Sequence, residues 1–314
     1  MRVLVTGVNG QLGHDVAAEL IKRGHTAIGS DLAPVPSASD VLQVKSLEDT
    51  AIPGPSYMQL DITDADAVMA ALSLIRPDAV IHCAAWTAVD LAEDEANAAK
   101  VRKVNVDGTR NIAVACKATN AKMLYLSTDY VFDGQGTEPW KPDEKDFAPL
   151  NVYGRGKLEG ELAISSILEK HFIVRIAWVF GLNGENFIKT MLHLGKTRDT
   201  VRVVNDQIGT PTYTYDLARL LVDMIGTDKY GFYHATNEGG YISWYDFACE
   251  IFRQAGMNTN VVPVTTDEYG LSKAARPFNS RLDKSKLAAS GFTPLPDWRD
   301  ALGRYLHELQ EGSV

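Results

Sequence analysis

The chain has 314 residues and a formal net charge of −9, with 45% hydrophobic and 23% charged residues. This length predicts one large domain or two closely built ones, because a domain usually holds about 100–200 residues. The excess of acidic residues argues against a nucleic-acid binder or a polybasic membrane-surface protein, and the hydrophobic fraction excludes a disordered chain.

The first half of the chain alternates short apolar runs with helical patterns. Nearly continuous apolar runs are typical of parallel strands that are covered on both faces. Because strand, helix and strand recur, this half predicts an α/β fold with a doubly wound parallel sheet, the Rossmann architecture. The expected strands are Arg2–Thr6, Thr26–Ser30, Tyr57–Leu60, Ala79–His82, Lys122–Ser127 and Phe172–Ile176, and the expected helices are Gln11–Arg23, Ala65–Leu74, Ala96–Thr119 and Val152–Leu168.

A stretch rich in proline and serine, Ala33–Ser56, interrupts this pattern between the second and third strands. A connection of this length without secondary structure of its own is unusual in a compact domain. Two interpretations stay open: a surface excursion without a role, or a lid over the adenosine end of a cofactor.

The regularity weakens after about residue 180, where prolines separate shorter elements. We interpret residues 1–180 as a dinucleotide-binding domain that also holds the catalytic pair, and residues 181–314 as a smaller C-terminal substrate-binding lobe. Part of residues 213–240 is expected to return to the first domain. The helices expected in this half are Asn186–Lys196, Tyr215–Ile225, Ser243–Ala255 and Trp298–Leu309.

Neither a signal peptide nor a membrane segment is predicted. The most apolar later run, Phe172–Leu182, is short and contains Arg175, whereas a membrane helix needs about 20 mostly apolar residues. Cys83, Cys116 and Cys249 show no metal-ligand spacing, and an odd, sparse set of cysteines favours a reducing compartment. We therefore expect a cytoplasmic protein.

A glycine-rich turn follows the first expected strand and opens the first helix. Its glycines allow a tight turn and let backbone amides approach a diphosphate closely. The helix start adds free N–H groups and the positive end of the helix dipole. This context predicts a dinucleotide site, for which the candidate residues are Gly7, Asn9, Gly10, Gln11, Leu12 and Gly13.

Other strand ends extend the predicted cofactor site. Asp31 ends the second strand, where a carboxylate accepts hydrogen bonds from a ribose 2′-hydroxyl and repels a 2′-phosphate, which favours NADH over NADPH. Asp61 and Ile62 follow the third strand, and Asp61 has two open interpretations, a contact to adenine or an N-cap of the next helix. The candidates after the fourth strand, beside the middle of the cofactor, are Ala84, Ala85 and Thr87.

A hydroxyl, a phenol and an ammonium group form the candidate catalytic set. Tyr153 and Lys157 stand four residues apart in an expected helix and therefore share one face. Because a nearby cation stabilises a phenolate, we expect Lys157 to lower the pKa of Tyr153, which then protonates a developing alkoxide. Taken alone, such a pair is better explained as two residues on a helix surface. Its position after the glycine turn and after Thr128, whose hydroxyl can hold the same oxygen, favours a carbonyl reductase.

These features resemble the extended short-chain dehydrogenase/reductase superfamily and, within it, the dTDP-4-dehydrorhamnose reductase family. The glycine turn and the Tyr153–Lys157 pair are shared by the superfamily, whereas Tyr130–Phe132, Trp178 and 207–212 are more particular to the family. The resembling segments span nearly the whole chain: Gly7–Gly13, Cys83–Asp90, Asn105–Thr109, Ser127–Gly134, Tyr153–Lys157, Arg175–Gly181, Asn205–Thr212 and Arg276–Leu282.

The resemblance implies reduction of dTDP-4-dehydro-L-rhamnose to dTDP-L-rhamnose, with NADPH or NADH as the hydride donor. It implies that Tyr153 protonates the C4 oxygen, that Lys157 binds the nicotinamide ribose, and that Asn105 belongs to the cofactor site. A small-molecule sugar nucleotide is thus the expected ligand, and a homodimer is possible. The residues implied to bind substrate are Thr128, Asp129, Tyr130, Trp178, Asn186, Gln207, Arg276 and Asn279.

Several of these residues have a structural interpretation as well. Trp178 also fits a core aromatic after a buried strand, Gln207 an ordered turn before Pro211, and Arg276 a surface salt bridge. Some family members hold magnesium with acidic residues between subunits. Thr197 stands where such members tend to be acidic, so we do not predict a magnesium site.

Two other functions stay open as alternatives. Sugar-nucleotide dehydratases and epimerases share the fold, but dehydratases typically place Asp-Glu after the active-site threonine, and here Asp129 is followed by Tyr130. The regulatory subunit of methionine adenosyltransferase also resembles this family and binds a partner enzyme. The presence of Trp178 and of the whole Asn205–Thr212 segment favours the enzyme.

Overall fold

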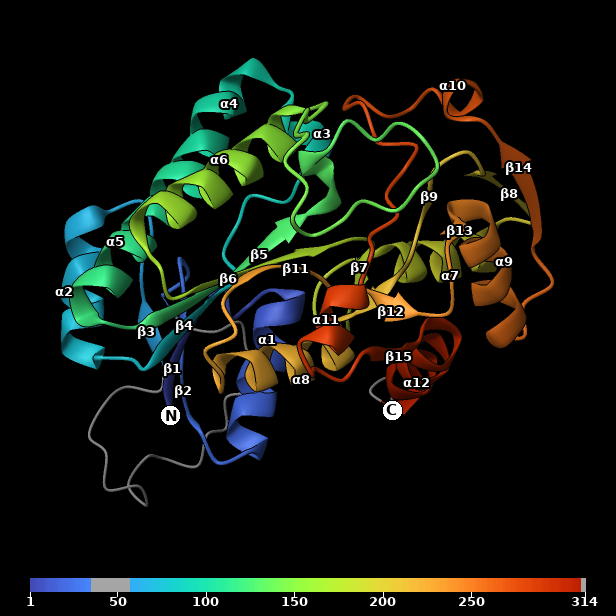
Figure 1. Cartoon of the computed structure of the whole chain (residues 1–314). Coiled ribbons are helices and arrows are strands. Elements are labelled where there is room, and N and C mark those ends of the chain that lie inside the picture. Colours follow the sequence, from blue (N-terminus) through green and yellow to red (C-terminus); the bar gives the residue numbers. More distant parts are fainter. Residues whose placement is uncertain (35–56, 312–314) are drawn as a thin grey trace.

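The computed structural model describes residues 1–34 and 57–311, which form the layered arrangement in Figure 1. The Ala33–Ser56 connection, with its proposed lid role, therefore lies almost wholly outside the described residues.

Seven parallel strands form the central sheet, in the order β11-β6-β5-β4-β1-β2-β3. The six strands expected from the sequence are confirmed, each end within one residue. The chain runs outwards from β1 to β3 and then resumes at β4 on the other side of β1, so the direction of winding reverses between β1 and β4. Such a reversal opens a crevice at the carboxyl ends of the two strands. The strands are β1 (Arg2–Thr6), β2 (Thr26–Asp31), β3 (Tyr57–Gln59), β4 (Ala79–His82), β5 (Lys122–Thr128), β6 (His171–Ile176) and β11 (Gly231–His234).

Helices cover both faces of this sheet (Figure 1), which explains why its strands are apolar throughout. On one face α1 (Gln11–Lys22) packs beside α8 (Thr214–Ile225). On the other face lie α2 (Ala65–Ile75), α5 (Thr109–Thr119) and α6 (Val152–Ile167). The described helices include none that is long and apolar enough to span a membrane.

The expected helix Ala96–Thr119 is confirmed as an unbroken helical stretch, but it contains a π-helical turn that the sequence analysis did not predict. A short α3 (Val89–Ala92) is followed by α4 (Glu95–Arg102), and a π-helical turn at Lys103–Gly108 separates α4 from α5. This turn places Asn105 against the chain after β4, where its side-chain oxygen accepts from the Trp86 amide at 2.8 Å and its nitrogen donates to the Trp86 carbonyl at 3.2 Å. A π turn shifts the apolar spacing by one residue, and the apolar residues on either side of it are too few to reveal that shift in the sequence.

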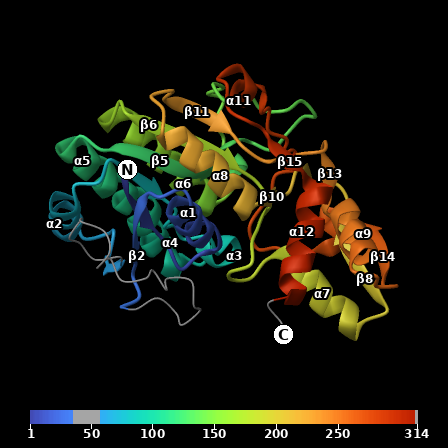
Figure 2. The same cartoon turned by 90° about the horizontal axis from the view of Figure 1, so that it is seen from below.

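Most of the later helices and short strands gather beside the sheet (Figure 2), and buried apolar residues between Phe180 and Leu306 form a second core there. The chain returns to the sheet through α8 to β11, which pairs with β6 at the sheet edge, and again at Leu287 and Phe292, which pack in the core on the α8 face of the sheet. The helices predicted in this half are confirmed as α7 (Phe187–Thr197), α8, α9 (Trp244–Gln254) and α12 (Trp298–Glu311). The sequence analysis missed β8 (Thr200–Val204), β14 (Asn260–Val264), α10 (Thr266–Tyr269), α11 (Ser285–Ala289), and the short strands β7 (Val179–Phe180), β9 (Ile208–Gly209), β10 (Thr212–Tyr213), β12 (Asn237–Glu238), β13 (Ile242–Ser243) and β15 (Leu295–Asp297).

Candidate active site

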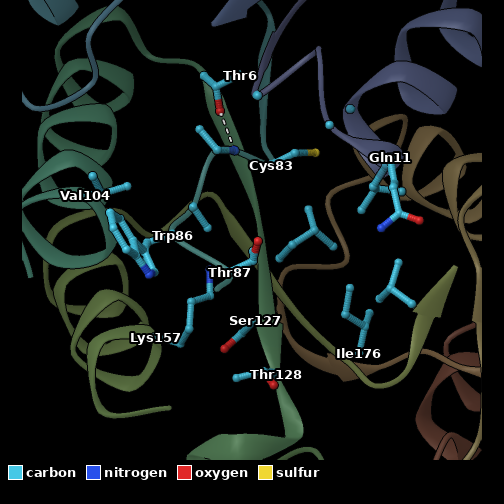
Figure 3. Close-up of a pocket in the computed structure, with 18 of the residues that line it drawn as sticks. Thr6, Gln11, Cys83, Trp86, Thr87, Val104, Ser127, Thr128, Lys157 and Ile176 are labelled. Atoms are coloured by element: carbon cyan, nitrogen blue, oxygen red, sulfur yellow. Dashed lines mark hydrogen bonds between the residues drawn. The ribbon is translucent and has the colours of Figure 1, made fainter. Parts of the chain in front are cut away.

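A cavity of about 630 Å³ opens at the carboxyl ends of the central strands, where the winding of the sheet reverses. The glycine turn after β1 lies at one end, and residues from the end of β5, from α6 and from the C-terminal region lie at the other. Figure 3 shows Gln11, Trp86, Thr128 and Lys157 around this space. One continuous cavity thus joins the predicted cofactor residues to the predicted catalytic residues.

The glycine turn is shaped for a close approach of backbone to ligand. Gly7 has a φ of +69°, and a Cβ added there would lie 2.6 Å from the Ala84 nitrogen. A Cβ on Gly13 would overlap the Gly7 carbonyl. Gly10 precedes α1, and no described side chain caps the helix start. Because its first amides are left to a ligand, the turn fits the diphosphate of a nicotinamide dinucleotide.

Carboxylates line the cavity near the ends of β2 and β3. Asp31 accepts hydrogen bonds from the backbone amides of Asn9 at 3.1 Å and Leu32 at 2.8 Å. Asp61 and Ile62 also line the cavity. The N-cap of α2 is Asp64, which accepts from the Ala67 amide, so the N-cap interpretation of Asp61 is wrong.

The predicted contacts to the middle of the cofactor divide into two groups. Ala84, Ala85 and Thr87 line the cavity directly. Asn105 is buried instead. Its side-chain oxygen accepts from the backbone amide of Trp86, and its side-chain nitrogen donates to the backbone carbonyl of Trp86. Asn9 likewise contributes its backbone amide to Asp31 rather than lining the cavity.

The three candidate catalytic residues meet at the other end of the cavity. Thr128 is the last residue of β5, and Tyr153 and Lys157 project from the first turns of α6. Asn151 caps that helix by accepting from the Gly154 amide at 2.7 Å. Gly154 itself packs against the Tyr130 backbone so closely that an added Cβ would overlap the Tyr130 carbonyl. This contact seats the start of α6 directly on the segment after β5.

Burial dominates the electrostatics of the catalytic residues. The pKa of Tyr153 is raised, first by burial and then by the charge of Asp129, so the predicted lowering by Lys157 is wrong in the ligand-free protein. Burial also lowers the pKa of Lys157 to about 7, against the opposing effect of Glu161. The phenol is therefore fully protonated at neutral pH and carries the proton that a reduction requires.

Two neighbours of Thr128 add polar groups to this end of the cavity. Asp129 is buried, accepts from the Thr128 hydroxyl at 3.0 Å, and has its pKa raised by burial to about 6. The buried hydroxyl oxygen of Ser127 has no hydrogen-bond partner among the described residues. Tyr130 lines the same wall, and its ring meets that of Tyr153 edge to face at 5.8 Å.

The predicted substrate residues do not all reach the cavity. Trp178 lines it, together with Asp129 and Tyr130. Asn186 is the N-cap of α7 and accepts from the Lys189 amide. Gln207 donates to the Thr266 hydroxyl at 3.0 Å.

Arg276 and Asn279 are also engaged in the fold. Arg276 forms an ion pair with Asp90 at 2.7 Å, which agrees with its salt-bridge interpretation. Asn279 is buried and donates to the carbonyls of Gln135 and Glu138. Their substrate roles stay predictions, as do those of Asn186 and Gln207.

Sequence reasoning missed several residues of the cavity wall. Trp86 lies in the Cys83–Asp90 segment that resembles the family, but the sequence analysis did not name it as a site residue. Ser127 precedes a predicted catalytic residue and could have been found from that position. Trp244 lies in no motif, and only the folded chain brings it to the cavity.

Comparisons with known proteins match nearly the whole chain. The RmlD substrate binding domain model matches residues 1–311. A dTDP-4-dehydrorhamnose reductase of Streptomyces griseus is 41% identical over 309 residues, which cover 96% of this chain and 91% of that protein. A dTDP-4-keto-6-deoxy-D-glucose reductase of Streptomyces niveus is 35% identical, with 96% and 95% covered. The structure of a dTDP-4-dehydrorhamnose reductase from Bacillus anthracis in complex with NADP is similar with a TM-score of 0.85, at 40% identity and covering 98% and 99% of the two chains.

Proposed function

The chain belongs to the dTDP-4-dehydrorhamnose reductase family, which makes it a nicotinamide-dependent oxidoreductase, and we propose that it reduces dTDP-4-dehydro-L-rhamnose to dTDP-L-rhamnose. The observation that carries the proposal is the single cavity that has the glycine turn at one end and Thr128, Tyr153 and Lys157 at the other. A cofactor along the glycine turn and a keto sugar beside Tyr153 would share this space.

Thr128, Tyr153 and Lys157 each have a different role in the proposed carbonyl reduction. When bound along the glycine turn, NADH or NADPH would supply the hydride for C4 of the sugar. Tyr153 donates its phenolic proton to the C4 oxygen, so that the carbonyl becomes an alcohol. The Thr128 hydroxyl holds the same oxygen, and Lys157, one turn further along α6, would bind the ribose of the nicotinamide. What supports this division is that all three side chains line one cavity, that Thr128 and Lys157 are buried in its wall while Tyr153 is half-buried, and that the Tyr153 phenol holds its proton at neutral pH.

The stereochemistry of the substrate is the finer part of the proposal. Trp178, Tyr130 and Asp129 line the wall where the hexose would lie. A relative with 35% identity is named for dTDP-4-keto-6-deoxy-D-glucose, so that keto sugar is the second candidate substrate. Both candidates are 6-deoxyhexoses on the same nucleotide, and they require the same chemistry at C4.

We also propose that NADH is the preferred hydride donor. The Asp31 carboxylate lines the cavity and is fixed by two backbone amides, and a carboxylate at the end of the second strand disfavours a 2′-phosphate. The Bacillus anthracis relative was crystallised with NADP. Titration of the protein with each reduced cofactor, followed by nicotinamide fluorescence, measures the preference directly.

The deciding experiment combines each keto sugar with NADH and with NADPH, and follows cofactor oxidation and the configuration of the product. We expect turnover with dTDP-4-dehydro-L-rhamnose that is lost in Tyr153→Phe. Tyr245→Phe is the matched control, because that tyrosine lies on α9 and does not line the cavity. An inactive wild type that binds cofactor, or a fully active Tyr153→Phe, overturns the proposal. Faster turnover of the D-glucose-derived sugar establishes the second candidate.

Three broader features belong to the same proposal. Residues 1–180 serve the cofactor and the catalytic pair, while 181–314 shape the sugar-nucleotide site and return to the sheet through β11. The enzyme acts in the cytoplasm, with its three cysteines as free thiols. It forms a homodimer, which light scattering on the purified protein tests.

A further inference from the structure

Trp178 has an unusual backbone for a tryptophan. Its φ is +50°, in the left-handed region that residues with a side chain seldom adopt. It follows β6 by two residues and lines the cavity on the substrate side. A non-glycine residue keeps such a conformation only where its neighbours determine it, and these residues cluster in functional sites. The contacts of Trp178 therefore indicate what holds it there.

The indole of Trp178 is stacked on the indole of Trp244. The two ring centroids are 3.7 Å apart and the planes differ by 16°. Phe187 packs against Trp244 as well, at 4.6 Å and a tilt of 53°. Trp244 thus lies within an aromatic row that runs from α7 through α9 to the cavity wall, and it also lines the cavity itself.

The local structure around Trp244 fixes its position. Ser243 and Asp246 form a capping box at the start of α9, and Trp244 is the first residue of that helix. The preceding strand β13 pairs with β9, so that Ile242 lies opposite Gly209. A Cβ on Gly209 would come 2.8 Å from the Trp178 ring. One pairing of two short strands therefore brings both neighbours of Trp178, Gly209 and Trp244, into contact with it.

Trp178 and Trp244 differ from the other tryptophans in the hydrogen bonding of their indole N–H groups. Trp86, Trp140 and Trp298 each donate to a backbone carbonyl. Trp178 and Trp244 make no indole N–H hydrogen bond to any residue that the structure describes. The flat faces of these indole rings can pack against C–H groups of a ligand, and their N–H groups can donate to its oxygens. A sugar offers both kinds of group.

We propose that Trp244 is a positioning residue for the sugar nucleotide: by stacking, it fixes the plane of Trp178, which packs against the C–H face of the 6-deoxyhexose. This inference rests on the proposed function for the identity of the sugar. The stack holds the hexose against the cavity wall that Tyr153 also lines. Trp244 takes no part in proton or hydride transfer, and its loss weakens sugar binding while the chemistry and the cofactor site stay intact.

The test compares three variants in the full-length enzyme. Trp244→Phe keeps a flat ring, Trp244→Leu keeps an apolar side chain without a flat face, and Tyr245→Phe controls for changes on α9. For Trp244→Leu we expect KM for the keto sugar to rise roughly tenfold, the effect of losing one aromatic contact. We expect kcat and KM for the cofactor to stay within about twofold of wild type, and Trp244→Phe to restore most of the affinity.

A spectroscopic measurement reports the stack without activity. Two indoles at this separation produce an exciton couplet in circular dichroism, which we expect in wild type and Tyr245→Phe and not in either Trp244 variant. Binding of dTDP-rhamnose is followed by tryptophan fluorescence in all proteins. Equal affinities of folded Trp244→Leu, Trp244→Phe and wild type overturn the proposal, as does a wild type without the couplet. If wild type binds the nucleotide sugar and shows the couplet but reduces neither keto sugar, the proposed function fails and the binding comparison still decides the role of Trp244.

Discussion

The Nζ atom of Lys157 lies 4.0 Å from the centroid of the Tyr125 ring. The lysine is 3% exposed and Tyr125 is fully buried beneath it, with its hydroxyl donating to the Lys157 carbonyl at 3.4 Å. An aromatic face attracts a cation and offsets part of the cost of burying it. Burial remains the larger effect, because the pKa of Lys157 falls to about 7.

This pKa predicts how the stability of the ligand-free protein depends on pH. The unfolded lysine has a pKa of 10.5, so between about 7 and 10.5 the unfolded state binds the proton more strongly. The contribution of Lys157 to the free energy of unfolding therefore rises with pH across this window and is lost as the pH falls through 7. Urea unfolding of wild type and Lys157→Met measures it. We expect the difference between the two proteins to change with pH in this window, and a constant difference contradicts the prediction.

Asp129 gives a second pH dependence, of opposite sign. Burial raises its pKa from 3.8 to about 6, so the folded state holds this proton more strongly than the unfolded state does. The stabilisation is complete below pH 3.8 and disappears as the pH rises through 6. At neutral pH, Asp129→Asn removes a buried charge, and we expect it to raise the free energy of unfolding by up to about 3 kcal/mol, since one pKa unit is about 1.4 kcal/mol. Turnover should fall, because the amide changes the hydrogen bond to Thr128. A variant that is less stable than wild type at neutral pH and equally stable in acid would show that Asp129 is stabilised by its charge instead.

The sequence predicts the framework of the site because strand order and helical spacing determine it. Thr128 ends a strand, and Tyr153 and Lys157 are one helical turn apart, so the fold has few ways to separate them. The ionisation of these groups was predicted wrongly for Tyr153, since residue spacing carries no information on how deeply a phenol is buried. For Asn186 and Gln207, the sequence motif does not distinguish a side chain that contacts a ligand from one that forms hydrogen bonds within the protein. Trp244 reaches the cavity through the pairing of β9 and β13, two-residue strands that have no sequence pattern of their own.

The glycine turn provides a prediction on cofactor binding. In Gly13→Ala the new methyl group overlaps the Gly7 carbonyl, so the turn must open and its amides lose their alignment. We expect the Kd for NADH to rise at least tenfold, which corresponds to about 1.4 kcal/mol. Gly303→Ala is the control, because Gly303 lies within α12 and its nearest neighbour is the side-chain oxygen of Gln254. Titration by nicotinamide fluorescence gives both constants. A Gly13→Ala protein with the affinity of wild type shows that the turn does not bind the diphosphate.

Variants of Asn186 test whether this residue stabilises the fold or binds the substrate. Its oxygen accepts from the Lys189 amide at 3.1 Å, and its nitrogen donates to Gln11 at 3.2 Å and to the Tyr305 hydroxyl at 2.9 Å. These bonds cap α7 and tie it to the residue that begins α1 and to α12. Asn186→Ala removes them all, and the loss of the cap alone costs about 1 kcal/mol. We expect thermal unfolding at a lower temperature and, if the residue is structural, a KM for the keto sugar within about twofold of wild type. Asn186→Asp keeps the cap acceptor but replaces the donating nitrogen, so it should recover only the capping part of the stability. A large rise in KM in both variants, with cofactor affinity unchanged, would instead establish the contact to substrate that the sequence predicted.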